Sequence, residues 1–157
     1  MPDFSHLYKR PAGLSAEPKA LPQEQYPGII KFFEFAETST QKIPVVRVHL
    51  ALLGWPDSVQ EKDRYLTDGE GKQVPIEITK KQFRRDFMTP EDFSNPAWFY
   101  FDQFLRTCGL EPQGHSYEEL IPQLIGQRVT VEIQQYLNQN TNNIGNQVGR
   151  VFGPNPV

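Results

Sequence analysis

Residues suited to catalysis are few in this sequence, and none of them forms a known motif. The three histidines, His6, His49 and His115, lie far apart, and none has the spacing of a metal ligand. The sequence contains no nucleophile elbow and no phosphate-binding glycine loop. Residues 68–72 read Asp-Gly-Glu-Gly-Lys, with too few ligands for a calcium loop and without the helix of a phosphate loop. A solvated turn is the better interpretation of this segment.

The single cysteine, Cys108, limits the chemistry further. It excludes an intramolecular disulfide and a multi-cysteine zinc site. Cys108 shares a helical spacing with Trp98, Phe101 and Leu105, which favours a buried core thiol over a nucleophile. A lone cysteine is compatible with a reducing cytoplasm, where we expect the protein to work. We therefore expect a protein that is not an enzyme and has no cofactor and no metal.

Cations combined with aromatic rings are the chemistry that the sequence does offer. Proteins that bind single-stranded nucleic acid hold the phosphates with cations and stack the bases on rings. Two predicted strands and the segment 72–85, which has five basic residues and one acidic residue, supply most of these groups. The candidate nucleic-acid-binding residues are Lys31, Phe33, Phe35, Arg47, His49, Lys80, Lys81, Arg84, Arg85, Tyr136 and Arg150.

Each of these groups also has a purely structural interpretation. Phe33 and Phe35 would equally suit a second small core beneath the N-terminal segment. Basic residues of the segment 80–85 would suit an edge strand, where lysine prevents pairing between sheets. Tyr136 would suit cross-strand packing. These alternatives stay open at this point.

The net charge of −3 counts against a nucleic-acid partner unless the charge is segregated. Such segregation exists along the chain. Residues 72–85 are strongly basic, whereas residues 91–120 contain six acidic residues and one arginine. A positive groove on one side of the protein is therefore compatible with a negative total.

Two strands are predicted near the start of the chain, and they form an antiparallel hairpin. Residues 29–35 are rich in β-branched and aromatic side chains, and residues 44–53 follow after a polar turn. In the second strand, alternation places 46, 48, 50 and 52 toward the core and 45, 47, 49 and 51 on the other face. In the first strand, Ile30 and Phe32 are the expected core pair, with Lys31, Phe33 and Phe35 opposite. Both faces of this strand carry aromatics, so its buried face stays open.

The rest of the chain alternates between turns, helices and strands. Residues 57–75 form a long connection or a second small hairpin, and a third strand lies within 76–88. Thr89 and Pro90 have the pattern of a helix start, the helical stretch 95–108 ends at Gly109, and Ser116 begins a short helix that ends at Gly126. Strands are expected at 128–136, with Val129, Val131 and Ile133 inward, and at 146–152.

This order of elements predicts a mainly β fold. Five strands with helices inserted between the third and the fourth is the order of a five-stranded OB-fold barrel. We expect a flexible N-terminal arm over residues 1–25, one domain over 26–153 and a short tail over 154–157. No apolar run is long enough for a membrane helix, and the N-terminus lacks a secretory signal.

The sequence resembles the small OB-fold single-stranded-DNA-binding proteins of tailed bacteriophages. The resemblance covers about residues 24–153 and depends on the order of five short segments: 26–28 (Tyr-Pro-Gly), 44–48 (Pro-Val-Val-Arg-Val), 98–109, 124–129 (Leu-Ile-Gly-Gln-Arg-Val) and 146–148 (Asn-Gln-Val). It implies a protein that coats transient single strands during phage replication or recombination, in the cytoplasm of the bacterial host. No acidic residue follows Glu132, so recruitment of partners through an acidic C-terminal tail is not expected.

We therefore expect sequence-tolerant binding of single-stranded DNA by a monomer or small homo-oligomer, with replication or recombination proteins as further partners and no membrane. The alternative is an OB-like protein–protein interaction module of a phage or host assembly, which would not bind nucleic acid. Exposed aromatics and the acidic segment 91–120 favour that alternative.

Overall fold

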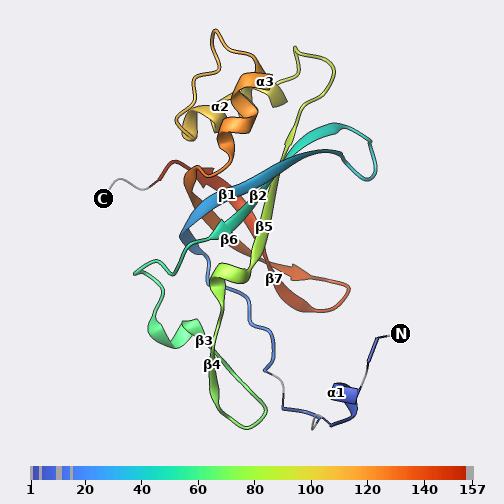
Figure 1. Cartoon of the computed structure of the whole chain (residues 1–157), viewed down its shortest axis with the longest axis vertical. Helices are drawn as coiled ribbons and strands as arrows, with labels where there is room; N and C mark the ends of the chain where they lie inside the picture. Colours follow the sequence, from blue (N-terminus) through green and yellow to red (C-terminus); the bar gives the residue numbers. More distant parts are fainter. Residues whose placement is uncertain (1, 4, 10–11, 15, 155–157) are drawn as a thin grey trace.

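A five-stranded antiparallel sheet forms the centre of the protein (Figure 1). The structure is a computed structural model that describes residues 2–3, 5–9, 12–14 and 16–154. The strands pair in the order β5-β2-β1-β6-β7. Their bounds are β1 Glu24–Glu37, β2 Pro44–Leu52, β5 Gln82–Met88, β6 Arg128–Asn138 and β7 Asn143–Phe152. The prediction of a mainly β fold with a β1–β2 hairpin is confirmed.

Shorter elements occupy the two ends of this sheet (Figure 1). The helices α2 and α3 lie at one end, and the small β3–β4 hairpin lies at the other, so the second small hairpin is the correct alternative for residues 57–75. The bounds are α1 Ser5–Lys9, η1 Glu61–Arg64, β3 Tyr65–Thr67, β4 Gln73–Pro75, η2 Ile78–Lys80, α2 Ala97–Thr107, α3 Tyr117–Leu120 and η3 Ile121–Leu124. None of the helices in the described ranges is long and apolar enough to cross a membrane.

The helix starts are partly as predicted. The Ser116 side chain accepts a hydrogen bond from the Glu119 amide, and Gly109 has a φ of +83°, as a helix-ending residue needs. The predicted start at Thr89 and Pro90 is wrong. The Thr89 amide instead donates to the carbonyl of Pro44 at 2.8 Å, which extends the β2–β5 ladder, and α2 begins only after Pro96. Between the two, the side chains of Asp92 and Asn95 accept hydrogen bonds from the amides of Ser94 and Ala97.

The N-terminal segment enters the core before β1 begins. Leu21 is fully buried, although it falls within the predicted arm of residues 1–25. Its amide donates to Asn146 Oδ1 at 2.7 Å, and its carbonyl accepts from Asn146 Nδ2 at 3.0 Å. Asn146 Nδ2 also donates to the carbonyl of Gln134. Gln135 Nε2 of β6 donates to the Leu21 carbonyl at 2.9 Å, so side chains of β6 and β7 together fix the backbone of Leu21 against the sheet.

A β-bulge in β1 changes which side chains face the core. The pairing runs from Ile30 opposite Leu50 directly to Phe32 opposite His49, so Lys31 is an extra residue without a partner on β2. Because side chains alternate between faces, one extra residue reverses the rest of the strand. Phe32 is 50% exposed, whereas Phe33 lies opposite Val48 and packs against the core. The expectation that Ile30 and Phe32 form the core pair is therefore wrong for Phe32.

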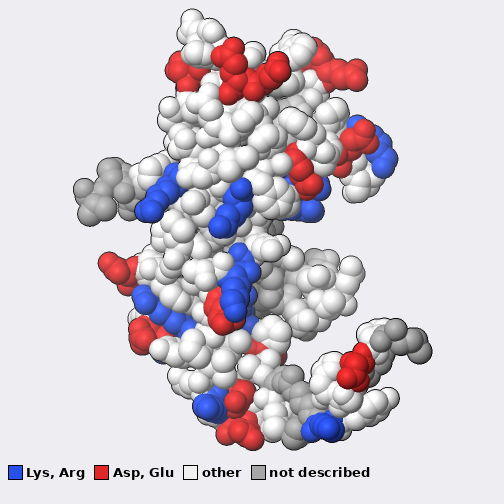
Figure 2. All heavy atoms as spheres, in the orientation of Figure 1, with Lys and Arg blue, Asp and Glu red and all other residues white. Residues whose placement is uncertain are grey.

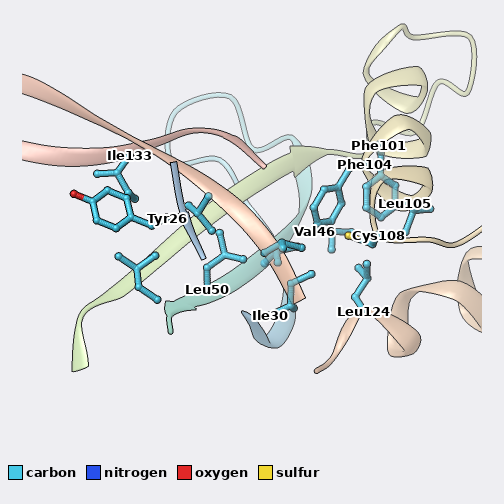
Figure 3. Packing of buried hydrophobic residues seen from close by; sticks show 14 of the residues in the cluster. Tyr26, Ile30, Val46, Leu50, Phe101, Phe104, Leu105, Cys108, Leu124 and Ile133 are labelled. Atoms are coloured by element: carbon cyan, nitrogen blue, oxygen red, sulfur yellow. The ribbon is translucent and has the colours of Figure 1, made fainter. Parts of the chain in front are cut away.

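The core runs along the inner face of the sheet to α2 (Figure 3). Val46, Val48, Leu50 and Leu52 of β2 are at most 2% exposed, as predicted. The same holds for the predicted inward residues of β6, Val129, Val131 and Ile133. From α2 come Phe101, Phe104 and Leu105. Cys108 is a buried core thiol, and burial raises its pKa to about 12.

The sheet is not closed into a barrel. Among the residues that the structure describes, no backbone pairing joins β5 to β7, although these are the two edges that a five-stranded barrel would unite. Side chains of both strands line a groove between the edges instead. The predicted barrel closure is therefore absent.

The bulge predicts unequal costs for two neighbouring substitutions. We expect Phe33→Ala to lower the free energy of unfolding by about 2 kcal/mol, below the ~3–5 of a fully buried phenylalanine. Phe32→Ala should cost less than about 1 kcal/mol, because its ring is half in water. Urea denaturation of both variants measures the difference. An equal or reversed order of the two costs would contradict the bulge.

Candidate nucleic-acid interface

A groove of about 720 Å³ lies between the edges of β5 and β7. Its lining comes from three strands besides β5 itself, and the β1–β2 and β6–β7 hairpins project on the same side of the molecule (Figure 1). The lining residues are His49, Gln82, Phe83, Arg84, Arg85, Asp86, Tyr136, Asn146, Gln147 and Val148. Four predicted binding residues, His49, Arg84, Arg85 and Tyr136, are thus brought together at one place.

The two arginines reach this groove from opposite faces of β5. Arg84 lies opposite His49 on the outer face, and Arg85 lies opposite Val48 on the inner face. The guanidinium of Arg85 lies 5.5 Å from the centre of the Phe87 ring, and this cation–π contact orients the guanidinium. Both side chains are exposed, and neither has a carboxylate within 4 Å among the described residues. They are the cations of the groove that remain free for an anionic ligand.

Tyr136 is held in place by a glycine on the neighbouring strand. It lies opposite Gly145, where an added Cβ would come within 2.8 Å of the Tyr136 ring. The ring therefore covers the bare backbone of Gly145, as aromatic side chains do beside strand glycines. It stays 43% exposed. Tyr136 is a cross-strand packing residue whose remaining surface faces the groove.

Arg47 is paired within the protein, unlike the two arginines of β5. Its Nε and Nη2 donate to the two carboxylate oxygens of Asp86 at 2.9 and 3.2 Å, and its Nη1 lies 3.6 Å from Glu34 Oε1. The hydrogen bond to Asp86 is the main cause that raises the pKa of Arg47. Arg47 therefore ties β1, β2 and β5 together and neutralises the carboxylate of the groove.

A stacked pair of rings adjoins the groove, and sequence reasoning missed half of it. Phe32 and His49 lie face to face with centroids 4.1 Å apart and planes 12° apart. His49 Nε2 bonds Glu34 Oε1 at 2.9 Å, and this bond is the main cause that lowers the pKa of Glu34. Phe32 was assigned to the core because no residue pattern marks the bulge. Its exposed half offers an aromatic surface of the kind on which bases stack.

The other predicted residues lie outside this groove. Phe33 and Phe35 face the opposite side of the sheet from Arg47 and His49, so the expectation that they share one face is wrong; the bulge is the reason. Lys31 is exposed at the bulge, and Lys81 directly precedes β5. Two further residues complete the set: Lys80, whose Nζ pairs with Glu77 at 3.1 Å, and Arg150, an exposed residue of β7.

Acidic side chains gather at one end of the molecule. Figure 2 shows carboxylates gathered over the end that carries α2 and α3, with lysines and arginines in separate places across the middle. In the described part of the chain, no three His, Cys, Asp or Glu side chains are arranged to hold a metal ion. Comparison with known proteins finds no matching family model and no matching curated relative.

The contact between His49 and Glu34 predicts a specific titration. We expect His49→Phe to keep the ring stack and to raise the pKa of Glu34 toward its ordinary value, because the Nε2 partner is lost. In the native protein a lowered pKa adds stability at pH above the ordinary value, which is lost as the pH falls through the lowered one. NMR titration of the Glu34 carboxyl carbon measures the shift.

A matched control is His115→Phe, which removes the only other histidine paired with a carboxylate in the described ranges, Glu119. It should leave the pKa of Glu34 unchanged. A Glu34 titration curve that is the same in the native protein and in His49→Phe would contradict the assigned cause.

Proposed function

We propose that this protein binds single-stranded DNA without strict sequence preference, through the groove between β5 and β7. The carrying observation is the convergence of Arg84 and Arg85, both free of carboxylate partners in the described part of the chain, with the exposed ring surface of Tyr136. Cations for phosphates and rings for bases are what a single-strand site needs. The Phe32–His49 stack extends this surface across the outer face of β1 and β2.

We further propose that the domain is an OB fold with an open seam. Support comes from the pairing order, in which the third, second, first, fourth and fifth long strands are neighbours, and from the helices placed between the third and the fourth. OB folds bind oligonucleotides on the face of the second and third strands and with the loops of the first and last hairpins. Here those strands are β2 and β5, which carry His49 and Arg84.

The biological setting of the proposal comes from the resemblance to phage single-strand-binding proteins. On this ground we propose a role in replication or recombination of phage DNA, in the host cytoplasm. The negative total charge does not oppose this role. The acidic end with α2 and α3 lies away from β3 and β4, and the groove lies beside β5 between these ends. Local rather than total charge governs contact with phosphates, since screening limits each charge to about 10 Å.

The test is a titration of labelled oligo-dT and of a duplex of equal length, followed by fluorescence anisotropy at several salt concentrations. We expect saturable binding of the single strand that weakens as salt rises. Arg84→Glu with Arg85→Glu should weaken it at least about tenfold. This variant should also make the plot of log affinity against log salt shallower by about 1.4, since each single-strand phosphate contact contributes about 0.7.

The matched control is Lys62→Glu with Lys72→Glu. It reverses two exposed lysines at the end that carries β3 and β4, and it changes the net charge by the same amount as the arginine variant. It should leave the salt slope unchanged. Absence of saturable binding at low salt, or equal losses in the two double variants, would contradict a site at β5.

The ring surface gives a second, independent test. Phe32→Ala should weaken oligo-dT binding by about 1–3 kcal/mol, the range measured for base stacking, and Phe32→Tyr should retain it. Phe35→Ala serves as the control, because Phe35 is 72% exposed but lies on the other face of the sheet. Equal binding by the Phe32→Ala variant and the native protein would remove the stack from the interface.

A further inference from the structure

A second pocket lies on the opposite side of the sheet from the proposed DNA groove. It measures about 460 Å³, between the β1–β2 hairpin and the helical end. Its walls are mainly apolar, with aromatic rings from β1, α2 and α3. The principal lining residues are Phe33, Phe35, Val46, Trp98, Phe101 and Tyr117. This size is within the range of pockets that take small ligands or single anchoring side chains.

The polar atoms of these rings already have partners. Trp98 Nε1 donates to the carbonyl of Pro90 at 3.0 Å, and the Tyr117 hydroxyl donates to Asp102 Oδ1 at 2.6 Å. Burial, together with this bond, raises the pKa of Tyr117 to about 12. Both ring donors would therefore keep their hydrogen bonds when an apolar group enters the pocket. Burying such a group against Trp98 and Tyr117 costs no hydrogen bond.

Two aromatic rings in and beside the pocket, Phe35 and Phe93, are exposed to solvent. Phe35 is 72% exposed and lies against Phe33 at 5.6 Å between centroids; Phe93 is 76% exposed and lies 5.0 Å from Trp98. Tyr117 lies 5.0 Å from Trp98, so Phe93, Trp98 and Tyr117 form one row of contacting rings, and Phe33 and Phe35 form a second row that lines the same pocket. Exposed apolar patches of this kind mark binding surfaces in proteins.

The rim of the pocket is acidic. Glu118 lines the pocket, and Glu91 and Asp92 directly precede Phe93. In the ranges that the structure describes, none of these three carboxylates has a cation within 4 Å. Residues 89–122 contain six acidic residues and one arginine, and the arginine is paired with Glu111. Figure 2 shows the carboxylates gathered at this end.

We infer that this pocket docks a short cationic segment of another protein, with an aromatic or large aliphatic side chain inserted between Phe35 and Trp98 and with lysines or arginines on the acidic rim. Charge complementarity selects this occupant. Nucleic acid and anionic lipid surfaces are repelled by the rim, and two copies of this chain would bring two acidic rims together. The inference does not depend on DNA binding, which uses the other face.

The test uses dye-labelled synthetic peptides of equal length and fluorescence anisotropy at low salt. One peptide has a central Trp-Leu pair flanked by lysines, a second has glutamates as flanks, and a third keeps the lysines but replaces Trp-Leu by Gly-Ser. We expect saturable binding of the first peptide only. Phe35→Ala and Phe93→Ala should each weaken it about tenfold, the effect of losing an anchoring contact.

Charge reversal at the rim tests the second half of the inference. Glu91→Lys with Glu118→Lys should weaken the first peptide about tenfold at low salt. The controls are Phe99→Ala, which removes an exposed ring of α2 outside the pocket, and Glu17→Lys with Glu70→Lys, which reverses two distant exposed carboxylates. Both controls should bind as the native protein does. Far-UV circular dichroism and urea midpoints like those of the native protein show that the Phe35→Ala, Phe93→Ala and Glu91→Lys/Glu118→Lys variants are folded.

Three results would overturn the inference. The first is no saturable binding of the lysine-flanked Trp-Leu peptide, and the second is equal binding of the glutamate-flanked peptide. The third is a dimer in sedimentation velocity that Phe35→Ala dissociates, because the pocket would then be covered by a second copy of the chain.

Discussion

The bulge at Lys31 is the constraint on which both surfaces of the protein depend. One unpartnered residue in β1 turns the second half of the strand over. Phe32 then stacks on His49 beside the β5–β7 groove, while Phe33 and Phe35 lie over Val48 and Val46 on the side of α2. Without the bulge, the pattern of this strand would exchange these aromatic rings between the two faces.

The two surfaces differ in their charge. On the outer face, Arg47 pairs with Asp86, so the carboxylate that lines the groove is balanced and Arg84 and Arg85 of β5 set the local charge of the groove. At the helical end arginine is scarce, and in the described ranges Glu91, Asp92 and Glu118 have no cation within 4 Å. The two sides of the sheet therefore present a cationic groove and a pocket with an acidic rim, although the net charge of the whole chain is only −3.

Strand positions and inward faces of β2 and β6 were predictable, because strict alternation of β-branched and polar residues has one physical solution. Part of the candidate site was predictable as well, since four of the eleven candidate residues, His49, Arg84, Arg85 and Tyr136, meet in one groove. The bulge was not predictable, since residues 29–33 are apolar at nearly every position and fit either face. The pairing of Arg47 with Asp86 was also not predictable from the sequence, because it depends on the register of β2 and β5, which the residue types do not specify.

The hydrogen bonds of Asn146 limit which residues can replace it. Its short amide accepts from one backbone amide and donates to two carbonyls, and it lines the groove at the same time. Aspartate lacks the donor, lysine lacks the acceptor, and leucine lacks both. A substitution at this position of the groove wall therefore removes two of the hydrogen bonds that hold Leu21 and leaves the one from Gln135 Nε2 to the Leu21 carbonyl, so the shape of the groove and the anchoring of the amino-terminal end are coupled through one shared side chain.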